Sequence, residues 1–327
     1  MPGPLRLNRR SVLAGAGALS GWALSGCARE PAPSAGGALR IASYKGGART
    51  LLDAAGLANT PYRIEWSEFA GGNLITEAIE AGAVDIGSMS EIPPIFVAGR
   101  PTRLRIVAVQ RGDVNAQVTL VPKASPIRTA ADLKGKRVGY VRATTSQYFL
   151  ARLLAEQGLT LGDIQAVALS PQDGLSAFTQ GALDAWVIYG VQGNLARARL
   201  GARVLATGLG RLSGNYVQSA LADALDDPAR RAAIADHLQR LRKAYAWANA
   251  HPESWAAAQA AATGVPAEIY EALHRERSAP SVLGAVDAEA IASQQAVADA
   301  FADLKVIPAR VDVRPMWSRE FDEEIKI

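Results

Sequence analysis

The sequence has 327 residues, of which 49% are hydrophobic and 20% are charged, enough for two domains with cores of their own. Residues 1–26 hold three arginines and no acid, so the formal net charge of +4 falls to +1 for the remainder. A near-neutral chain without a run of basic residues gives no reason to expect nucleic-acid binding. The single cysteine excludes an internal disulfide and a metal site built on several cysteines.

Residues 1–27 are typical of an export signal, in which Arg9-Arg10 precedes the apolar, small-residue stretch 11–23. The two arginines fit a twin-arginine signal and fit the basic start of a general secretion signal equally well. Residues 24–27 look like a lipobox that ends at Cys27. Lipidation would make Cys27 the first mature residue, and the alternative is cleavage just after it. We expect a periplasmic or extracytoplasmic protein, which a lipid on Cys27 would anchor to the membrane.

Residues 28–38 are rich in proline, alanine, serine and glycine and predict a flexible tether. From residue 39 the pattern alternates between strands and helices. The expected elements are strand 39–43, helix 48–55, strand 62–68, helix 74–81, strand 83–87, short helix 92–98, and strands 104–110 and 118–122. Alternation of this kind favours a parallel or mixed α/β sheet.

The pattern then restarts. The expected elements are a turn at 131–135, strand 137–141, helix 146–157, strand 164–169, a helix that starts at Ser170-Pro171, strand 185–188, helix 194–200 and strand 203–207. After residue 213 the chain becomes rich in alanine, and apolar spacing predicts helices 228–250, 252–262, 266–276 and 288–304. We expect this helical tail to support the sheets from outside.

The two halves share a local pattern. Residues 78–86 and 177–185 both give a helix end, a glycine, a small residue, an apolar residue, an aspartate (Asp85 or Asp184) and an apolar strand. Helix–glycine–strand turns converge on this pattern, so one match would mean little. The strands that open the two halves are separated by nearly the same offset, and this favours two similarly wound lobes.

Ligands of open α/β sheets bind beyond the carboxyl ends of the strands. The loops expected there are rich in glycine, hydroxyls and asparagine, and several lead into helix starts. Such loops suit a small oxyanion held by neutral donors, with Lys45 or Arg142 to supply charge. The candidate contacts are Tyr44, Lys45, Gly46, Asn73, Ser88, Met89, Ser90, Thr144, Thr145, Ser146, Trp186 and Tyr189, followed by Asn215 and Tyr216. Alternatively, Thr144 and Thr145 are ordinary helix caps, and Trp186 belongs to a core.

Catalysis is the weaker interpretation of the sequence. The three histidines lie in the helical tail, Glu91 is the main acid of the loops, and it starts a helix. No nucleophile elbow, phosphate-binding loop, dinucleotide fingerprint or metal-ligand spacing is present. We therefore expect no cofactor, no metal and no enzymatic activity.

Seven phrases together resemble the aliphatic sulfonate-binding family of periplasmic solute-binding proteins, which serve ABC importers and are related to the taurine- and nitrate-binding proteins. They are Lys45-Gly46-Gly47, Gly87-Ser88, Pro93-Pro94-Ile95-Phe96, and residues 121–123, 125–128, 132–138 and 183–188. The resemblance covers residues 39–219 well and the helical tail loosely. The phrase at 132–138 is shared by many such receptors, whereas those at 93–96 and 183–188 are narrower.

The resemblance implies a type II periplasmic-binding-protein fold, with two α/β lobes, a hinge and a helical C-terminal tail. Lobe 1 would comprise residues 39–123 and 213–327, lobe 2 residues 124–212, and the hinge crossings would lie near 118–123 and 206–213. It also implies a monomeric receptor that binds a small organic anion between the lobes and delivers it to a membrane permease.

The sequence departs from the family pattern at three places in the expected pocket. In the first loop, Tyr44 stands where the family usually has glutamine. After the tryptophan strand, Tyr189-Gly190-Val191 replaces the family's sequence of an aromatic residue, Asp and Pro. In the loop of the second lobe, residues 142–145 replace Lys-Gly-Ser-Asn. The ligand is therefore open: a different sulfonate, nitrate, an aromatic carboxylate or an uncharged pyrimidine precursor all fit the scaffold. An enzyme on the same scaffold is the alternative from another class.

Overall fold

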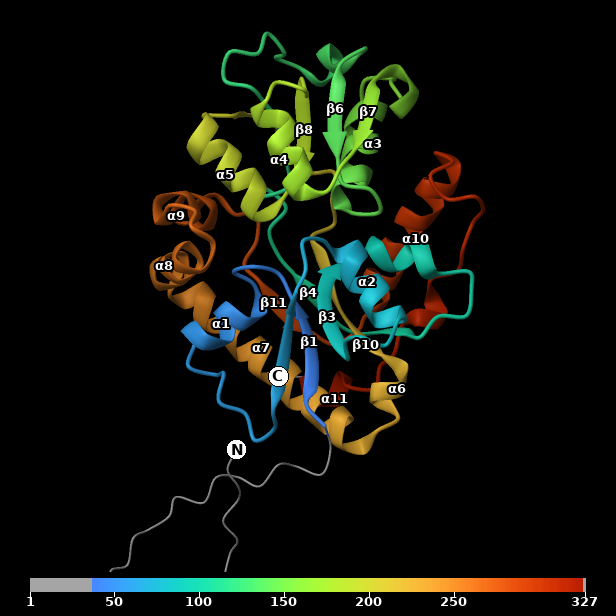
Figure 1. Ribbon diagram of the computed structural model, residues 1–327. Helices are drawn as coiled ribbons and strands as arrows, with labels where there is room; N and C mark the ends of the chain where they lie inside the picture. The colour runs from blue at the N-terminus through green and yellow to red at the C-terminus, as the bar shows by residue number, and fades with distance from the viewer. Residues whose placement is uncertain (1–36, 326–327) are drawn as a thin grey trace, which may run out of the picture. The chain divides into compact units, whose positions relative to one another are not determined.

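The computed structural model describes residues 37–325 (Figure 1). The predicted export signal, Cys27 and most of the predicted tether lie outside the described residues. Within residues 37–325, no helix has both the length and the apolar run that a bilayer span requires.

The first sheet has six strands in the order β11-β4-β10-β3-β1-β2. Strand β1 (Leu39–Ser43) pairs in parallel with β2 (Ile64–Glu68) and with β3 (Ile86–Ser90). Strand β10 (Asn215–Leu221) runs antiparallel between β3 and β4 (Leu104–Arg111), and β11 (Val282–Gly284) pairs with the far edge of β4.

The second sheet repeats this plan with five strands in the order β7-β6-β8-β5-β9. Strand β6 (Arg137–Tyr140) pairs in parallel with β7 (Gln165–Ala168) and β8 (Ala185–Ile188). Strand β5 (Val118–Val121) runs antiparallel between β8 and β9 (Arg203–Thr207). The expectation of two similarly wound α/β units is confirmed.

The chain passes between the sheets twice, and each passage delivers the antiparallel strand of the sheet it enters. Residues 112–117 lead from β4 to β5, and residues 208–214 lead from β9 to β10. Residues 118–121 therefore pair within the second sheet, although the sequence analysis assigned them to the first lobe.

Strand β10 was not predicted. Six of its seven residues are buried between two neighbouring strands, and the buried set includes Gln218 and Ser219. A strand that buries polar residues on both faces shows no alternation of polarity, which is the signal that a sequence pattern detects. Strand β3 was expected to end at residue 87 but continues through Ser88 and Ser90 for the same reason, because β10 pairs with it along this length.

Helices flank both sheets. Those that follow strands of the first sheet are α1 (Ala48–Ala54), α2 (Gly72–Glu80) and the short 3₁₀ helix η1 (Pro93–Val97). Those of the second are η2 (Ala130–Leu133), α3 (Thr145–Ala155), η3 (Leu161–Asp163), α4 (Pro171–Thr179) and α5 (Gly190–Leu200). Helix α5 begins four residues before its predicted start, and Ser170 caps α4 as expected.

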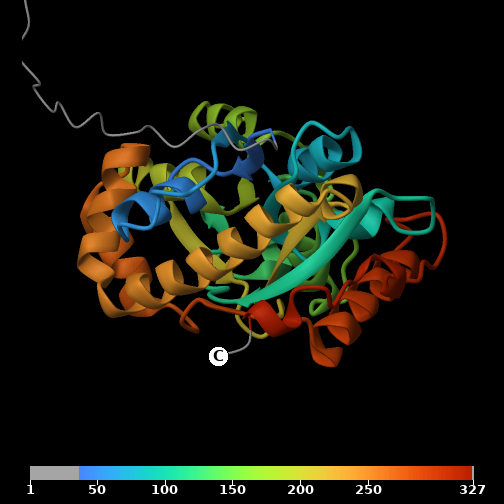
Figure 2. The same cartoon turned by 90° about the horizontal axis from the view of Figure 1, so that it is seen from below.

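The C-terminal part is helical, as the sequence predicts, apart from β10 and β11. It comprises α6 (Ala222–Leu225), α7 (Pro228–Ala250), α8 (Pro252–Thr263), α9 (Ala267–Glu276), α10 (Ala288–Asp303), η4 (Arg314–Met316) and α11 (Asp322–Ile325). Helices α8 and α9 lie on the opposite side of the first sheet from α10 in both views (Figures 1 and 2).

The aspartate of the repeated pattern forms the same contacts in both sheets. Asp85 accepts hydrogen bonds from the backbone N of Arg40 at 2.8 Å and from its Nη2 at 2.6 Å. Asp184 accepts from the backbone N of Arg137 at 2.8 Å and from its Nη2 at 2.8 Å. Each arginine also donates to the carbonyl of the glycine in the pattern, Gly82 or Gly181. This Arg–Asp clamp joins β1 to the turn before β3 in the first sheet and β6 to the turn before β8 in the second.

We expect Asp85→Ala to lower the free energy of unfolding by about 3 kcal/mol, because the carboxylate is fully buried and Arg40 keeps only the Gly82 carbonyl as an acceptor. Asp184 is 31% exposed, so water replaces part of what Asp184→Ala removes, and its loss should be clearly smaller. Urea denaturation of both variants measures the difference. Equal losses in the two variants would contradict a clamp whose strength depends on burial.

Candidate functional site

A cavity of about 470 Å³ lies at the carboxyl ends of the parallel strands of both sheets. We call it the cleft cavity. The first sheet contributes Tyr44, Lys45, Gly46, Gly47, Glu68, Phe69, Ala70, Gly72, Ser90 and Pro93, and β10 contributes Tyr216. The second contributes Thr144, Thr145, Gln172, Tyr189, Gly190, Val191 and Gln192, and the first crossing supplies Ala116 and Gln117. The strand-end loops predicted to form the site do meet in one place.

Three helices start at this cavity without a side-chain cap. Helix α1 follows Gly47, α2 begins at Gly72, and α5 begins at Gly190, and no side chain accepts a hydrogen bond from the first turn of any of them. The first N–H groups of a helix have no partner within it, and the helix dipole adds positive potential there. Convergent uncapped starts of this kind suit a bound anion.

Lys45 brings formal positive charge to the same place. It is exposed on the loop between β1 and α1 and makes no ion pair within residues 37–325. Among the described residues that line the cleft cavity, it is the only cation, and Glu68 is the only acid. Arg142, the other cation considered from the sequence, is exposed and does not line the cavity.

Three tyrosines enter the cleft cavity from different elements. Burial raises the pKa of Tyr189 and of Tyr216 to about 12, and burial together with the other two phenols raises the pKa of Tyr44 well above its usual value. All three are therefore neutral hydrogen-bond donors at physiological pH.

The tyrosine hydroxyls differ in their partners. The Tyr216 hydroxyl donates to the Asp113 carbonyl at 2.9 Å and accepts from Nε2 of Gln117 at 3.3 Å. The Tyr189 hydroxyl is buried and makes no well-formed hydrogen bond to the described residues. A buried donor without a partner is costly, and a ligand oxygen in the cavity would satisfy it.

Three of the five predicted serine and threonine residues donate to the protein itself. Thr144 caps α3 and donates to the Val141 carbonyl, and Thr145 donates to Oε1 of Gln117 at 3.0 Å. Ser146 donates to the Val187 carbonyl at 2.6 Å and does not line the cavity. The capping interpretation of Thr144 is confirmed.

Three further candidates, Trp186, Met89 and Asn73, lie away from the cleft cavity. Trp186 is fully buried under α4, where it packs against Phe178, and Met89 is fully buried in the core of the first sheet. Gly174 leaves room for the indole, because a Cβ there would lie 2.6 Å from its Nε1. Asn73, in the first turn of α2, does not line the cavity either. Apolar burial at a strand centre outweighed the aromatic signal at Trp186.

Glu91 and Asn215 form a structural anchor instead of a ligand contact. The buried Glu91 carboxylate accepts from Ser213 at 2.6 Å, Ser293 at 3.0 Å and Nδ2 of Asn215 at 3.2 Å. Burial raises the pKa of Glu91, and these three hydrogen bonds partly oppose that rise. The acid ties the second crossing to α10 and does not line the cleft cavity.

A second cavity, of about 350 Å³, adjoins the first and contains the candidate Ser88 in its wall. We call it the tail cavity, because helices α7, α8 and α9 form much of it. Its walls include Tyr245, Asn249, Trp255, Gln259, Tyr270 and His274. From the sequence these helices are expected only to support the sheets, and no pattern in it marks Gln117, Gln172 and Gln192 of the cleft cavity. Amphipathic spacing reports that a helix face is covered and does not distinguish a core from a cavity wall.

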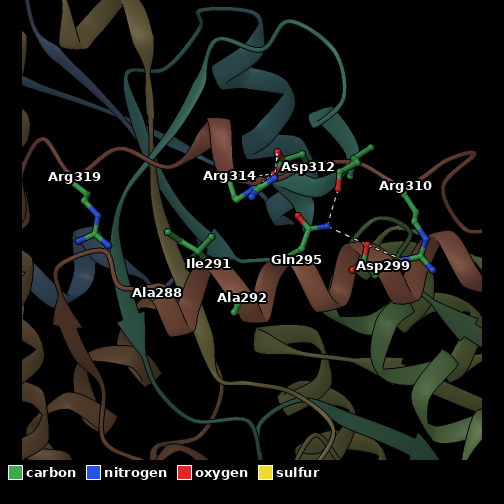
Figure 3. A pocket seen from close by; sticks show the side chains of 10 residues that line it. Ala288, Ile291, Ala292, Gln295, Asp299, Arg310, Asp312, Arg314 and Arg319 are labelled. Carbon is green, nitrogen blue, oxygen red and sulfur yellow. Dashed lines mark hydrogen bonds and ion pairs between the residues drawn. The ribbon is translucent and has the colours of Figure 1, made fainter.

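A larger hollow of about 690 Å³ lies along α10 (Figure 3). Its three arginines point toward carboxylates of the protein itself. Arg310 pairs with Asp299 and Asp303, Arg314 with Asp312, and Arg319 with Asp322. With its cations already paired, this groove is the poorer anion site. Within residues 37–325, no group of three His, Cys, Asp or Glu residues is placed to hold a metal ion.

Comparison with known proteins agrees with this geometry. Residues 64–255 match the family model described as NMT1/THI5 like. The chain is 35% identical over 253 residues to an Escherichia coli K12 protein named as an aliphatic sulfonates-binding protein, which covers 77% of this chain and 78% of that protein. It is 26% identical over 121 residues to the taurine-binding periplasmic protein of the same organism, covering 37% of each.

Two solved structures are similar over most of the chain. The periplasmic aliphatic sulphonate-binding protein SsuA of Escherichia coli superposes with a TM-score of 0.74 and 32% identity, covering 86% of this chain and 92% of that one. The alkanesulfonate-binding protein SsuA of Xanthomonas axonopodis pv. citri, bound to MOPS, superposes with a TM-score of 0.76 and 30% identity. The match covers 87% of this chain and 99% of that one. These similar proteins are solute-binding proteins rather than enzymes, and they have the periplasmic-binding-protein fold expected from the sequence.

A matched pair of variants separates the two kinds of tyrosine in the ligand-free protein. Tyr216→Phe should lower the free energy of unfolding by about 1–2 kcal/mol, because two hydrogen-bond partners are left unpaired. Tyr189→Phe should leave it unchanged or slightly raised, because its hydroxyl lies near Thr144 but makes no well-formed hydrogen bond that the substitution would remove. Both are measured by urea denaturation, and a loss at Tyr189 as large as that at Tyr216 would refute the assignment.

Proposed function

We propose that this chain, which belongs to the NMT1/THI5-like family and to the aliphatic sulfonate-binding proteins, is the solute receptor of an ABC importer. Its ligand is a small organic anion with a sulfonate group, bound in the cleft cavity. A cavity of about 470 Å³ is within the range of small-molecule sites.

One observation carries the choice of ligand: uncapped starts of α1, α2 and α5 meet Lys45 and the unpartnered Tyr189 hydroxyl in one cavity. A sulfonate presents three oxygens that spread one negative charge in three directions. Backbone N–H groups, a phenol and an ammonium can each donate to a different oxygen. The organic part of the ligand lies against Phe69, Pro93 and Val191, which line the same cavity.

The two sheets act as the cores of two lobes that close on the ligand. Residues 112–117 and 208–214 are the two crossings between them, and both are the natural places for a bend. The Thr145–Gln117–Tyr216 hydrogen bonds link the second sheet's α3, the first crossing and β10 beside the ligand. A ligand that contacts these hydrogen-bonded residues would shift the equilibrium between open and closed arrangements of the two lobes.

The receptor works outside the cytoplasmic membrane as a monomer and hands its ligand to a membrane permease. Support comes from the export pattern in residues 1–27 and from the periplasmic relatives. Lipidation of Cys27 anchors it beside that permease, with residues 28–38 as the tether. Intact-mass measurement of the protein from membranes, with and without Cys27→Ser, distinguishes lipidation from simple cleavage.

Binding is tested by thermal unfolding of the protein beginning at Ala28 with matched pairs of ligands, such as ethanesulfonate with propionate and benzenesulfonate with benzoate. Taurine, nitrate and sulfate complete the set. A ligand at a hundred times its Kd adds about 2.7 kcal/mol to stability, which is visible as a raised Tm. Sulfonates should raise the Tm more than their carboxylate partners. A rise with carboxylates or nitrate alone would contradict the proposed ligand.

Lys45→Ala should weaken sulfonate binding about tenfold, because one charge-assisted contact is lost. The matched control is Arg49→Ala, which removes an exposed cation from the neighbouring α1 that lines neither cavity. Isothermal titration calorimetry should find the control within about twofold of the unmodified protein. An equal weakening by both substitutions would mean that long-range charge, and not contact, is responsible.

A further inference from the structure

The tail cavity meets the cleft cavity along a boundary of small side chains. Both are lined by Gly46, Gly47, Ala116, Gly190 and Val191, with Tyr44, Lys45 and Tyr216 beside them. Gly190 lines both cavities, and an added Cβ there would have no atom within 4 Å, so no side chain fills the space beside it. A ligand group can therefore extend from one cavity into the other.

Aromatic rings form the far wall of the tail cavity. Tyr245 comes from α7, Trp255 from α8 and Tyr270 from α9. The Tyr270 hydroxyl is hydrogen-bonded to that of Thr263 at 3.0 Å, and a Cβ on Gly46 would lie 2.6 Å from Cγ2 of Thr263. The wall is thus held directly against the loop that carries Lys45.

Several polar groups of the tail cavity hold partners within the protein. Nε2 of His274 contacts Oε1 of Gln259 at 2.8 Å, and Arg277 donates to Oδ1 of Asn249 at 2.8 Å. The Asp113 carboxylate accepts from Ser278 and from two backbone amides of the first crossing. Lys45 brings charge to the boundary, and Arg277 and Asp113 are charged residues of the tail cavity whose side chains already hold protein partners. Three aromatic rings with a guanidinium in the same cavity suit a further ring, which packs favourably against both.

We propose that the tail cavity binds the distal part of the ligand, and that this part is an aryl or other ring group. This inference rests on the proposed function, because the sulfonate in the cleft cavity places the ring. The volume is sufficient: the tail cavity measures about 350 Å³, whereas an engineered apolar cavity of roughly 150 Å³ already binds benzene. The receptor therefore favours ring-bearing sulfonates over short alkanesulfonates.

Calorimetric titration with naphthalene-2-sulfonate and ethanesulfonate tests this selectivity. The unmodified protein should bind the naphthalene compound at least about tenfold more tightly, since the added ring contacts aromatic walls. Two substitutions alter the tail cavity alone: Ala279→Phe fills it and Trp255→Ala removes a wall. Each should weaken naphthalene-2-sulfonate binding about tenfold and leave ethanesulfonate binding within about twofold.

Trp247→Ala is the matched control, because Trp247 also packs on the core of the first sheet but lines neither cavity. Retained ethanesulfonate binding shows that each variant is folded. If ethanesulfonate binds but the ring gives no advantage, or if Ala279→Phe leaves the ratio of the two affinities unchanged, the tail-cavity assignment is wrong and the proposed function stands. If neither sulfonate binds the unmodified protein, both are overturned.

Discussion

The Arg–Asp clamp, formed once in each sheet, is the interaction on which the site depends. Asp85 and Asp184 each hold the backbone and guanidinium of an arginine on the first parallel strand, immediately before the third strand begins. The clamp fixes the starting points of neighbouring strands at the end away from the cleft. The opposite, carboxyl ends are then aligned, and the loops that follow them open α1, α2, α3 and α5 toward one cavity.

The polar groups at and around the cleft cavity are of two kinds: some hydrogen-bond to the protein and hold the fold, and others remain available to a ligand. Thr144, Thr145 and Glu91 satisfy protein partners, and they fix α3 and both crossings. Tyr189, Lys45 and the uncapped helix starts have no such partners among the described residues. This division is how a near-neutral chain would create the proposed anion site: a few donors are left without protein partners at one place, and the remainder are used elsewhere.

Sequence reasoning located the loops at the strand ends because α/β alternation is a strong periodic signal, and Tyr44, Lys45 and Tyr189 followed from their places in those loops. The sequence patterns were misleading where tertiary packing buries residues whose type or position suggests exposure. Strand β10 buries Gln218 and Ser219 and shows no alternation, whereas Trp186 and Met89 turned inward to the cores. The tail cavity was beyond reach for a different reason. Tyr245, Trp255 and His274 come from three helices, and only their tertiary packing brings them to one wall.

A crystal structure of the protein with a bound sulfonate would locate the anion relative to the helix starts. We expect sulfonate oxygens within hydrogen-bond distance of the first N–H groups of α2 and α5 and of the Tyr189 hydroxyl, with the Lys45 ammonium alongside. A sulfonate seated instead against the arginines of the α10 groove, or in the cleft cavity but away from the helix starts and Tyr189, would contradict this expectation.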